Sequence, residues 1–264
     1  MSANYTGAAY CRIKEMAVDT KERCRNETLG ARADGAFCDG FPFSKMRPAA
    51  KTRLIKEGMP QVFSRGHVIF MHEDQAQRFY FIKSGWIKLF RETIGGDEAI
   101  LDVLPPGSVF GEAAFCEGGV YAYGAEVIEN CEIVSYPLSL LETETRENGE
   151  FTIEFLKHVA ARGLARDKEI ELRSVQNAAQ RIGCFILRLC REESGNETTL
   201  CLPWEKSLIA ARLGMAPETF SRGLARLQKD TAMAINGPVI EIPDIKMLAR
   251  YTCVACSNVF PCKN

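Results

Sequence analysis

Residues 213–222 read LGMAPETFSR, and they predict the junction of two short helices. Gly214 is expected to end a first helix over 206–213 and to allow a tight turn. Pro217 suits the first position of a second helix, and Glu218 places negative charge at the positive end of that helix. Two helices joined in this way are typical of a helix-turn-helix.

The second helix, expected over 217–229, has an apolar and a polar face. Phe220, Leu224 and Leu227 recur at helical spacing and are expected to face inward. The polar face carries Glu218, Ser221, Arg222 and Arg226, which stand at positions i, i+3, i+4 and i+8 of the helix. Arginine bonds guanine O6 and N7, glutamate accepts from cytosine N4, and serine bonds several base edges. The pattern therefore favours a DNA recognition helix over an ordinary surface helix of mixed charge.

The surrounding segment supports this interpretation. Residues 232–242 predict a small hairpin that turns at Asn236-Gly237 and would form a wing. Between residues 205 and 230 there are five basic and three acidic side chains, so the local balance is 5 − 3 = +2, against −1 for the whole chain. A locally basic part within a nearly neutral chain is compatible with binding to DNA phosphates.

Upstream, from about 60 to 137, short runs of β-forming residues alternate with turn signals. The expected strands are 68–70, 79–82, 86–90, 99–103, 109–110, 125–128 and 132–136. Turns are expected between them, for example at 83–85, where Lys-Ser-Gly occurs. Regular short strands of this kind predict an antiparallel barrel or a jelly roll.

From about 138 the apolar residues change to helical spacing, and no proline interrupts residues 138–202. We expect one helix of about 25 residues, followed by a second. The apolar stripe of the long helix needs a partner, which a symmetric homodimer would supply. The alternative is that the stripe packs on its own barrel.

The chain is expected to comprise a lead-in (1–40), a jelly-roll sensor domain (41–150), a dimerisation helix (151–178), a winged-helix domain (179–250) and a cysteine-rich tail (251–264). No run of 18 apolar residues is present, and the N-terminus lacks an apolar signal segment. We therefore expect a cytoplasmic chain with no membrane partner.

At this point the chain resembles the Crp/Fnr family over about residues 60–250. The motif in 213–222, with its Glu-x-x-Ser-Arg pattern at 218–222, is similar to the recognition segment of the Fnr-like branch. The resemblance implies an α+β fold with a cyclic-nucleotide-binding-type β jelly roll, a long dimerisation helix and a C-terminal winged helix-turn-helix. It implies an activator that binds TTGAT-like half-sites in double-stranded DNA and acts with RNA polymerase. The implied DNA-contacting residues are Glu218, Ser221, Arg222, Thr219 and Arg226.

The same resemblance bears on the ligand of the sensor domain. Phe110-Gly111-Glu112 is similar to the family's nucleotide-binding signature, which in cAMP-binding members leads to an Arg-Ser pair. The matching positions here are Tyr121-Ala122, which offer neither a cation nor a hydroxyl donor of that kind. A buried phosphate without a cation is strongly disfavoured, so we expect no cAMP binding.

The chain has eleven cysteines. A reducing cytoplasm disfavours a disulfide framework and a chain of this length does not need one, which leaves metal binding, redox sensing and plain burial. The densest cluster is Cys253-x2-Cys256-x5-Cys262. Thiolates select zinc or iron–sulfur, and the spacing resembles the cluster motif of Fnr, although that motif lies at the N-terminus there. We expect a [4Fe–4S] cluster that senses oxygen, redox state or nitric oxide in anaerobic regulation. Zinc, thiol redox switching and no role stay open as alternatives.

The fourth cluster ligand is not fixed by the sequence. The resemblance implies Cys131, with Cys38 as a second candidate; a small buried core residue is the alternative for Cys131. A haem would instead need an axial ligand from His67, His72 or His158.

Two other classes of function are alternatives to a DNA-binding regulator. A cyclic-nucleotide-type ligand-binding module is disfavoured by Tyr121-Ala122 and by the winged helix. A metalloenzyme is disfavoured because no nucleophile–base or acid–base set accompanies the cysteine cluster. We therefore expect no enzymatic activity.

Overall fold

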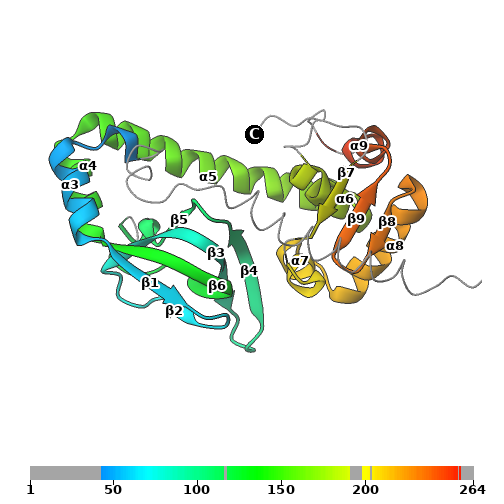
Figure 1. The fold of residues 1–264 in the computed structure, drawn as a ribbon, viewed down its shortest axis with the longest axis horizontal. Helices are drawn as coiled ribbons and strands as arrows, with labels where there is room; N and C mark the ends of the chain where they lie inside the picture. The colour runs from blue at the N-terminus through cyan, green and yellow to red at the C-terminus, as the bar shows by residue number, and fades with distance from the viewer. Residues whose placement is uncertain (1–42, 116–117, 191–197, 203, 255, 257–264) are drawn as a thin grey trace, which may run out of the picture. The chain divides into compact units, whose positions relative to one another are not determined.

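The computed structural model describes residues 43–115, 118–190, 198–202, 204–254 and 256. The expected lead-in, 1–40, and Cys262 lie outside these residues. The chain divides into two compact units between Arg166 and Asp167, and helix α5 (Gly149–Val175) crosses this boundary (Figure 1). Within the described ranges, no helix combines the length and apolar character that a membrane span requires.

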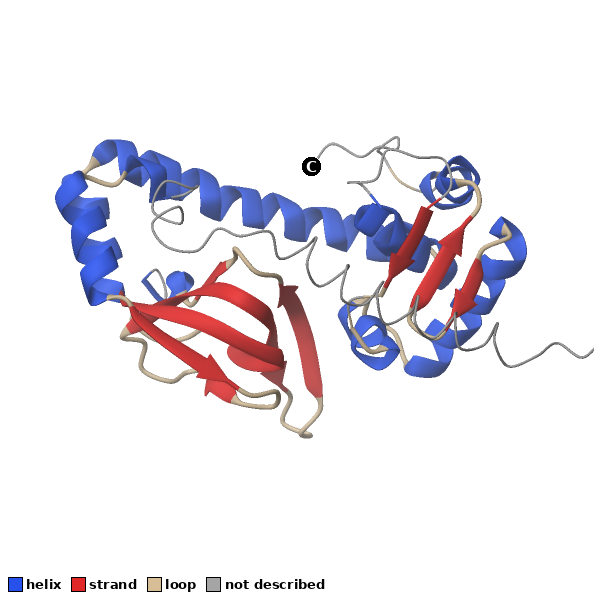
Figure 2. Ribbon diagram, in the orientation of Figure 1, coloured by secondary structure: helices blue, strands red, loops and turns tan. Residues whose placement is uncertain are grey.

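The first unit, called here the sensor unit after the domain that the sequence leads us to expect, is an antiparallel sheet accompanied by helices (Figure 2). Its elements are η1 (Phe43–Lys45), α3 (Pro48–Glu57), β1 (Met59–Phe63), β2 (Val68–Phe70), β3 (Arg78–Glu92), β4 (Glu98–Leu104), β5 (Val109–Phe110), η2 (Glu112–Phe115), β6 (Gly124–Pro137), α4 (Leu138–Glu147) and the first part of α5.

β3 and β6 pair along almost their whole lengths and form the centre of the sheet. β1 and β5 flank the pair at one end, whereas β2 and β4 flank it at the other. The strand order β1-β6-β3-β4 leaves β1 and β4 as edges, so the described strands form an open β sandwich and not a closed barrel. The expected jelly-roll type of fold is confirmed, and the closed-barrel alternative is wrong.

The expected turn at 83–85 is wrong, and two pairs of expected strands are each one continuous strand. The segments 79–82 and 86–90 belong to the single strand β3, and 125–128 and 132–136 belong to the single strand β6. Around Gly85, which has φ +81°, the register with β6 shifts three times but pairing continues. Glycine here makes a bulge that bends the strand without reversing it. β1 was missed because its residues are almost all exposed and give no alternating pattern.

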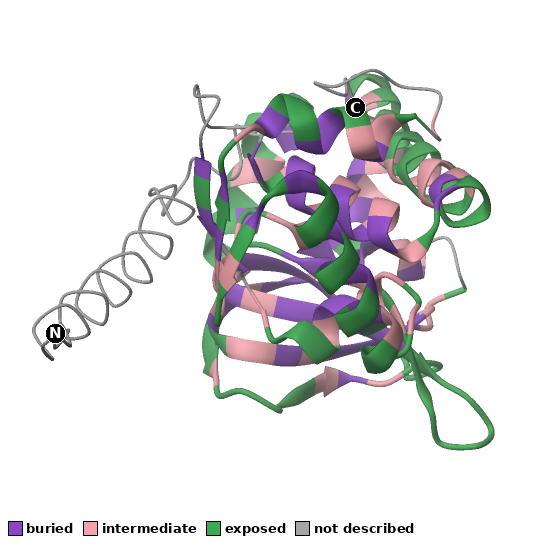
Figure 3. Ribbon diagram, turned by 90° about the vertical axis from the view of Figure 1, so that its right-hand side faces the viewer, coloured by how far each residue is buried: buried purple, intermediate pink, exposed green. Residues whose placement is uncertain are grey.

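The interior of the sensor unit is mainly aromatic. Phe43, Phe79, Phe110 and Phe151 are fully buried, and Phe43 stacks on both Phe79 and Phe151. Since Phe151 belongs to α5, this helix begins as part of the sandwich core. Figure 3 colours the chain by burial and shows buried segments along the strands. Truncation of such a residue to alanine typically costs about 3–5 kcal/mol.

The second unit, called here the DNA-binding unit, contains the end of α5 and a small three-stranded sheet. Its other elements are α6 (Ala178–Leu189), β7 (Thr198–Cys201), α7 (Lys206–Arg212), α8 (Pro217–Thr231), β8 (Ala234–Asn236), β9 (Val239–Ile242) and α9 (Ile245–Cys253). The strand order is β7-β9-β8. Its core comprises Ile182 and Ile186 of α6 together with Phe220, Leu227 and Leu248. The expected two helices and wing are confirmed.

Candidate functional site

The face of α8 that was expected to contact DNA is accessible. Its exposed side chains include Glu218, Ser221, Arg222 and Arg226, and Thr219 is partly buried. The opposite face is buried, with Phe220 and Leu224 2% and 6% exposed and Leu227 fully enclosed. The division of α8 into these two faces was therefore predictable from the spacing of its apolar residues.

The polar residues of α8 differ in their surroundings. Ser221 Oγ donates to the carbonyl of Pro217 at 2.9 Å, and its oxygen can still accept a hydrogen bond. Arg226 Nε lies 3.5 Å from the carboxylate of Asp230. Within the described part of the chain, Arg222 has no comparable partner, so its guanidinium is available for an external acceptor.

The turn before α8 has the conformation that the sequence predicts. Gly214 has φ +65°, in the region that residues with a Cβ rarely adopt. Pro217 is the first residue of α8 and Ala216 its N-cap. On the other side of α8, β8 and β9 pair and turn at Gly237, which has φ +64°. The helix N-terminus and the wing are thus both formed by local sequence signals.

The count of basic residues overstates the positive charge offered to DNA. Arg212 is only 15% exposed and forms a two-point ion pair with Glu169 of α5. Arg226 is paired with Asp230. The other basic residues of this segment, Lys206, Arg222 and Lys229, are exposed.

The sensor unit contains a buried charged cluster at the expected nucleotide-binding signature. Glu112 is 2% exposed, and its Oε1 accepts from Arg162 Nη1 and lies 3.6 Å from His158 Nε2. Burial alone would raise the pKa of Glu112, but hydrogen bonding with His158 and the charge of Arg162 lower it. Both partners come from α5, so this helix neutralises the carboxylate from within the chain.

Tyr121, which was expected to stand in place of the arginine of a cAMP site, packs inside the sandwich. It is 4% exposed, stacks on Phe70 with ring centroids 3.6 Å apart, and donates its hydroxyl to the carbonyl of Arg78 at 2.7 Å. Burial raises the pKa of Tyr121, and it raises the pKa of Tyr123 to about 12. The hydroxyl oxygen of Tyr123 accepts a hydrogen bond from Gly111 N–H at 3.0 Å. These hydroxyls stay neutral at physiological pH and supply no charge for a phosphate.

The described thiols of the tail lie at the end of α9. Cys253 is its last residue, both Cys253 and Cys256 are half-buried, and Cys256 N–H donates to the carbonyl of Cys253 at 3.4 Å. The two thiols therefore belong to one chain turn. Cys262 and Cys38 lie outside the described residues. Among the residues that the structure does describe, no group of three or more metal-binding side chains is assembled.

Cys131 lies in β6 and is 2% exposed in the sandwich core. Burial raises the pKa of this thiol to about 11, which disfavours the thiolate that a metal binds. The packing is that of a small core residue, and binding a cluster would require Cys131 to leave it.

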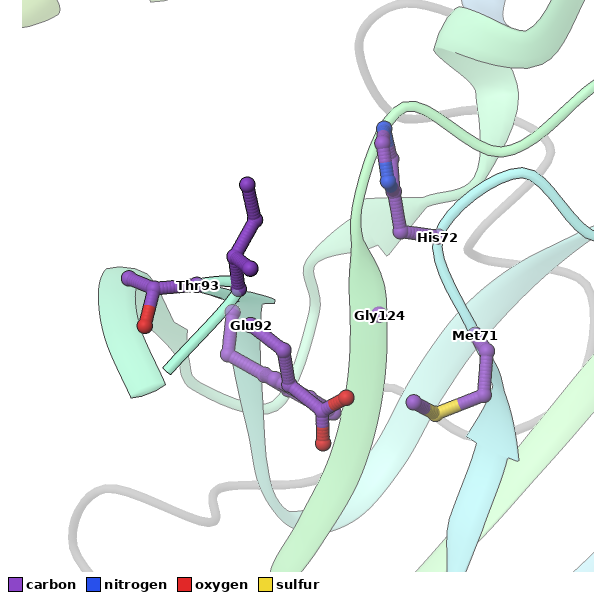
Figure 4. A pocket seen from close by; sticks show the side chains of 7 residues that line it. Met71, His72, Glu92, Thr93 and Gly124 are labelled. Carbon is purple, nitrogen blue, oxygen red and sulfur yellow. The ribbon is translucent and has the colours of Figure 1, made fainter. Parts of the chain in front are cut away.

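The three histidines have separate surroundings. His67 stacks on Phe63, His158 faces Glu112, and His72 lines an open hollow of about 300 Å³. Figure 4 shows this hollow, with Met71 and Glu92 on either side of Gly124. Its volume is at the lower limit of ligand pockets, and its lining is partly exposed.

Sequence reasoning missed the role of Arg162. Nothing in the sequence connects Glu112 with His158 or Arg162, because about 50 residues of chain separate the carboxylate from its partners. The available signal was the i, i+4 spacing of His158 and Arg162, which places two hydrogen-bond donors on one face of a helix.

Comparison with known proteins supports this architecture. A family model described as cyclic nucleotide-binding domain matches residues 60–148, and one described as Crp-like helix-turn-helix domain matches residues 180–251. The global nitrogen regulator of Nostoc sp. is 28% identical over 72% of this chain and 87% of its own length. The anaerobic regulatory protein of Haemophilus influenzae is 26% identical over 82% of this chain and 84% of its own length. FixK2 from Bradyrhizobium japonicum has the same fold, with a TM-score of 0.65 at 20% identity, covering 75% of this chain and 99% of its own.

The two matched domains define a Crp-like transcription regulator that binds double-stranded DNA through its helix-turn-helix. The chain belongs to the Crp/Fnr family, whose members are regulators and not enzymes.

Proposed function

We propose that the chain acts as a homodimer and reads paired TTGAT-like half-sites through α8. The observation that carries this proposal is the exposed N-terminal face of α8, with Glu218, Ser221 and Arg222 on adjacent turns. In the major groove, arginine would pair with a guanine, glutamate with a cytosine, and serine with a neighbouring base edge. Thr219 and Arg226 flank this set and are proposed to contact the sugar–phosphate backbone.

The proposed dimer is supported by α5. This helix of 27 residues exposes a series of large apolar side chains, which are Ile153, Leu156, Val159, Leu164 and Ile170. Pairing α5 with its copy would remove this surface from water and give a two-fold axis. A symmetric dimer presents two copies of α8, which fits half-sites about one helical turn apart. RNA polymerase is the expected further partner at such a site.

Binding is tested by fluorescence anisotropy at one fixed salt concentration, because affinity for DNA depends strongly on salt. The probes are a duplex with two inverted TTGAT half-sites and a duplex of the same composition in scrambled order. We expect the palindrome to bind at least about 1,000-fold more tightly. Equal affinity for the two duplexes would contradict sequence-specific reading.

We further propose that Cys253, Cys256 and Cys262 bind a [4Fe–4S] cluster with a fourth ligand from Cys131 or Cys38. The two described thiols belong to one turn, and thiolates are the donors that such clusters take. Bound, the cluster would supply a centre sensitive to oxygen, redox state or nitric oxide. The relative from Haemophilus influenzae is named an anaerobic regulatory protein, which supports a signal of this kind. Because Cys131 is buried with a raised pKa, its use requires a local rearrangement.

The cluster is tested on protein purified without oxygen, by iron and sulfide analysis and by absorption near about 400 nm, where thiolate- and sulfide-ligated iron absorbs. Cys253→Ser is expected to abolish iron binding, whereas Cys184→Ser, a half-buried thiol of α6, is the matched control and should retain it. Purified protein that holds zinc, or no metal, would contradict the proposal.

Neither cAMP nor haem is part of the proposed function. Tyr121 occupies the sandwich interior with its hydroxyl already bonded, and Glu112 is neutralised by α5. Isothermal titration with cAMP is expected to show no binding at millimolar concentration (Kd above about 1 mM). Saturable binding at micromolar concentration would contradict this part of the account.

A further inference from the structure

The last turns of α5 contact the helix-turn-helix directly. Arg212, at the end of α7, donates from Nη1 to Glu169 Oε2 at 2.8 Å and from Nη2 to the other carboxylate oxygen. Arg212 and Glu169 are 15% and 25% exposed. A bidentate pair of this kind fixes the orientation of both groups and not only their separation.

Two more arginines hold the same turn through its backbone. Arg173 of α5 donates from Nη2 to the carbonyl of Arg212 at 3.2 Å, and Arg181 of α6 donates from Nη1 to the carbonyl of Leu213 at 3.2 Å. The last carbonyls of a helix lack intrahelical partners and carry partial negative charge, so guanidinium groups stabilise them. A Cβ on Gly214 would lie 3.5 Å from Arg173 Cζ, which shows how closely this arginine lies against the turn.

Glu169 carries the negative charge of this arrangement. It pairs with Arg212 through both carboxylate oxygens, and Arg188 Nη1 lies 4.0 Å from one of them, Oε1. Burial and the nearby charge of Arg173 lower the pKa of Arg181, so positive charges are crowded here. Loss of Glu169 would leave this group of arginines without its carboxylate, and the turn would lose its main polar link to α5.

We propose that Glu169, Arg173, Arg181 and Arg212, together called the turn clamp, fix the angle at which α5 presents the recognition helix. In this assignment Arg212 is a positioning residue and not a phosphate contact. The proposal rests on the proposed function, because α5 carries the dimer axis and α8 the DNA contacts. Within a dimer, the turn clamp would set how well both copies of α8 engage a palindrome at the same time.

The sharpest test is Glu169→Gln, because charge and geometry predict opposite results. Removing a negative charge from a DNA-binding unit should strengthen binding if only electrostatics matters. If the turn clamp positions α8, the variant instead binds the TTGAT palindrome more weakly, by about fivefold or more. Binding to a duplex with a single half-site should change less than twofold, because one copy of α8 needs no fixed angle to its partner. Glu241→Gln, an exposed carboxylate of β9, is the matched control.

Arg212→Gln is the partner variant. It should repeat the selective loss on the palindrome while the slope of log affinity against log salt stays that of the wild type. A salt slope that is smaller by about one unit, together with an equal loss of affinity for the palindrome and the single half-site, would identify Arg212 as a phosphate contact and overturn the proposal.

A measurement without DNA separates this inference from the proposed function. Hydrogen exchange of the Leu213, Gly214 and Met215 amides is expected to be at least about fivefold faster in Glu169→Gln, with exchange in β3 and β6 unchanged. Wild-type exchange rates at this turn would overturn the turn clamp whatever the DNA result. Failure of the wild type to prefer the palindrome, with the exchange result as expected, would instead overturn the proposed DNA sequence preference.

Discussion

Replacing Arg162 by alanine is expected to destabilise the sensor unit by removing a charge partner from a buried carboxylate. Arg162 Nη1 donates to Glu112 Oε1, and Glu112 is 2% exposed. The other oxygen of Glu112, Oε2, has no hydrogen-bond partner among the described residues. The carboxylate therefore depends on Arg162 and on His158 for its compensation.

The size of the effect follows from this geometry. Removal of one member of a buried ion pair costs about 3–5 kcal/mol, because the other charge stays buried. His158 Nε2, 3.6 Å from Glu112 Oε1, retains part of the compensation, and Arg162 is 23% exposed, so water can enter the space it leaves. We therefore expect the lower limit, about 3 kcal/mol at about pH 7.5.

The loss should depend on pH. In the wild type, burial acts to raise the pKa of Glu112, but His158 and Arg162 lower it overall. A lowered folded-state pKa contributes stability above the unfolded-state pKa, and this stability is lost as pH falls through the folded-state value. In Arg162→Ala burial is expected to dominate and to raise the pKa, so protonation relieves the penalty. The difference between the two proteins should shrink to about 1 kcal/mol near pH 4.5.

The assay is urea unfolding followed by Trp86 fluorescence in a Trp204→Phe background. The chain has two tryptophans, Trp86 on β3 of the sensor unit and Trp204 in the DNA-binding unit, so this background reports on the sensor unit alone. Arg166→Ala, an exposed arginine one turn further along α5, is the control and should cost less than about 0.5 kcal/mol. Equal losses in the two alanine variants, or a loss that grows as pH falls, would refute the reasoning.

Three further predictions concern the other parts of the chain. Leu156→Arg places charge in the exposed apolar series of α5 and should weaken the dimer at least about tenfold by light scattering, with Lys157→Arg unchanged. Gly214→Ala forces φ +65° on a residue with a Cβ and should cost about 1 kcal/mol of unfolding free energy in the DNA-binding unit. Air exposure should weaken palindrome binding by the wild type but leave Cys253→Ser unchanged; equal oxygen sensitivity would argue against the tail as the sensor.

The helix-turn-helix was predictable because its signals are local. Gly214, Pro217 and the spacing of Phe220, Leu224 and Leu227 all lie within 14 residues, and each has one physical meaning. The wing at Gly237 is defined in the same way, by a turn that only a few residues permit.

The sensor unit was predicted less well because its decisive contacts are distant in the chain. Gly85 gives the same local signal for a turn and for a bulge, and only pairing with β6 decides between them. The pairing of Glu112 with Arg162, and of Glu169 with Arg212, depends on how α5 packs, which no local pattern reveals. For the same reason, a count of charges over residues 205–230 does not show that Arg212 is engaged by Glu169.

The account rests most directly on the identity of the recognition helix, and Arg222→Ala with a base-substitution series tests it. Each base pair of the TTGAT half-site is replaced in turn, identically in both half-sites, and affinity is measured for the wild type and for both Arg222→Ala and Arg146→Ala, an exposed arginine of α4. We predict that Arg222→Ala loses about 1–3 kcal/mol and no longer discriminates at one G·C pair, while Arg146→Ala follows the wild type. An equal loss on every sequence, with discrimination at each pair intact, would contradict the assignment of α8 as the element that reads the bases.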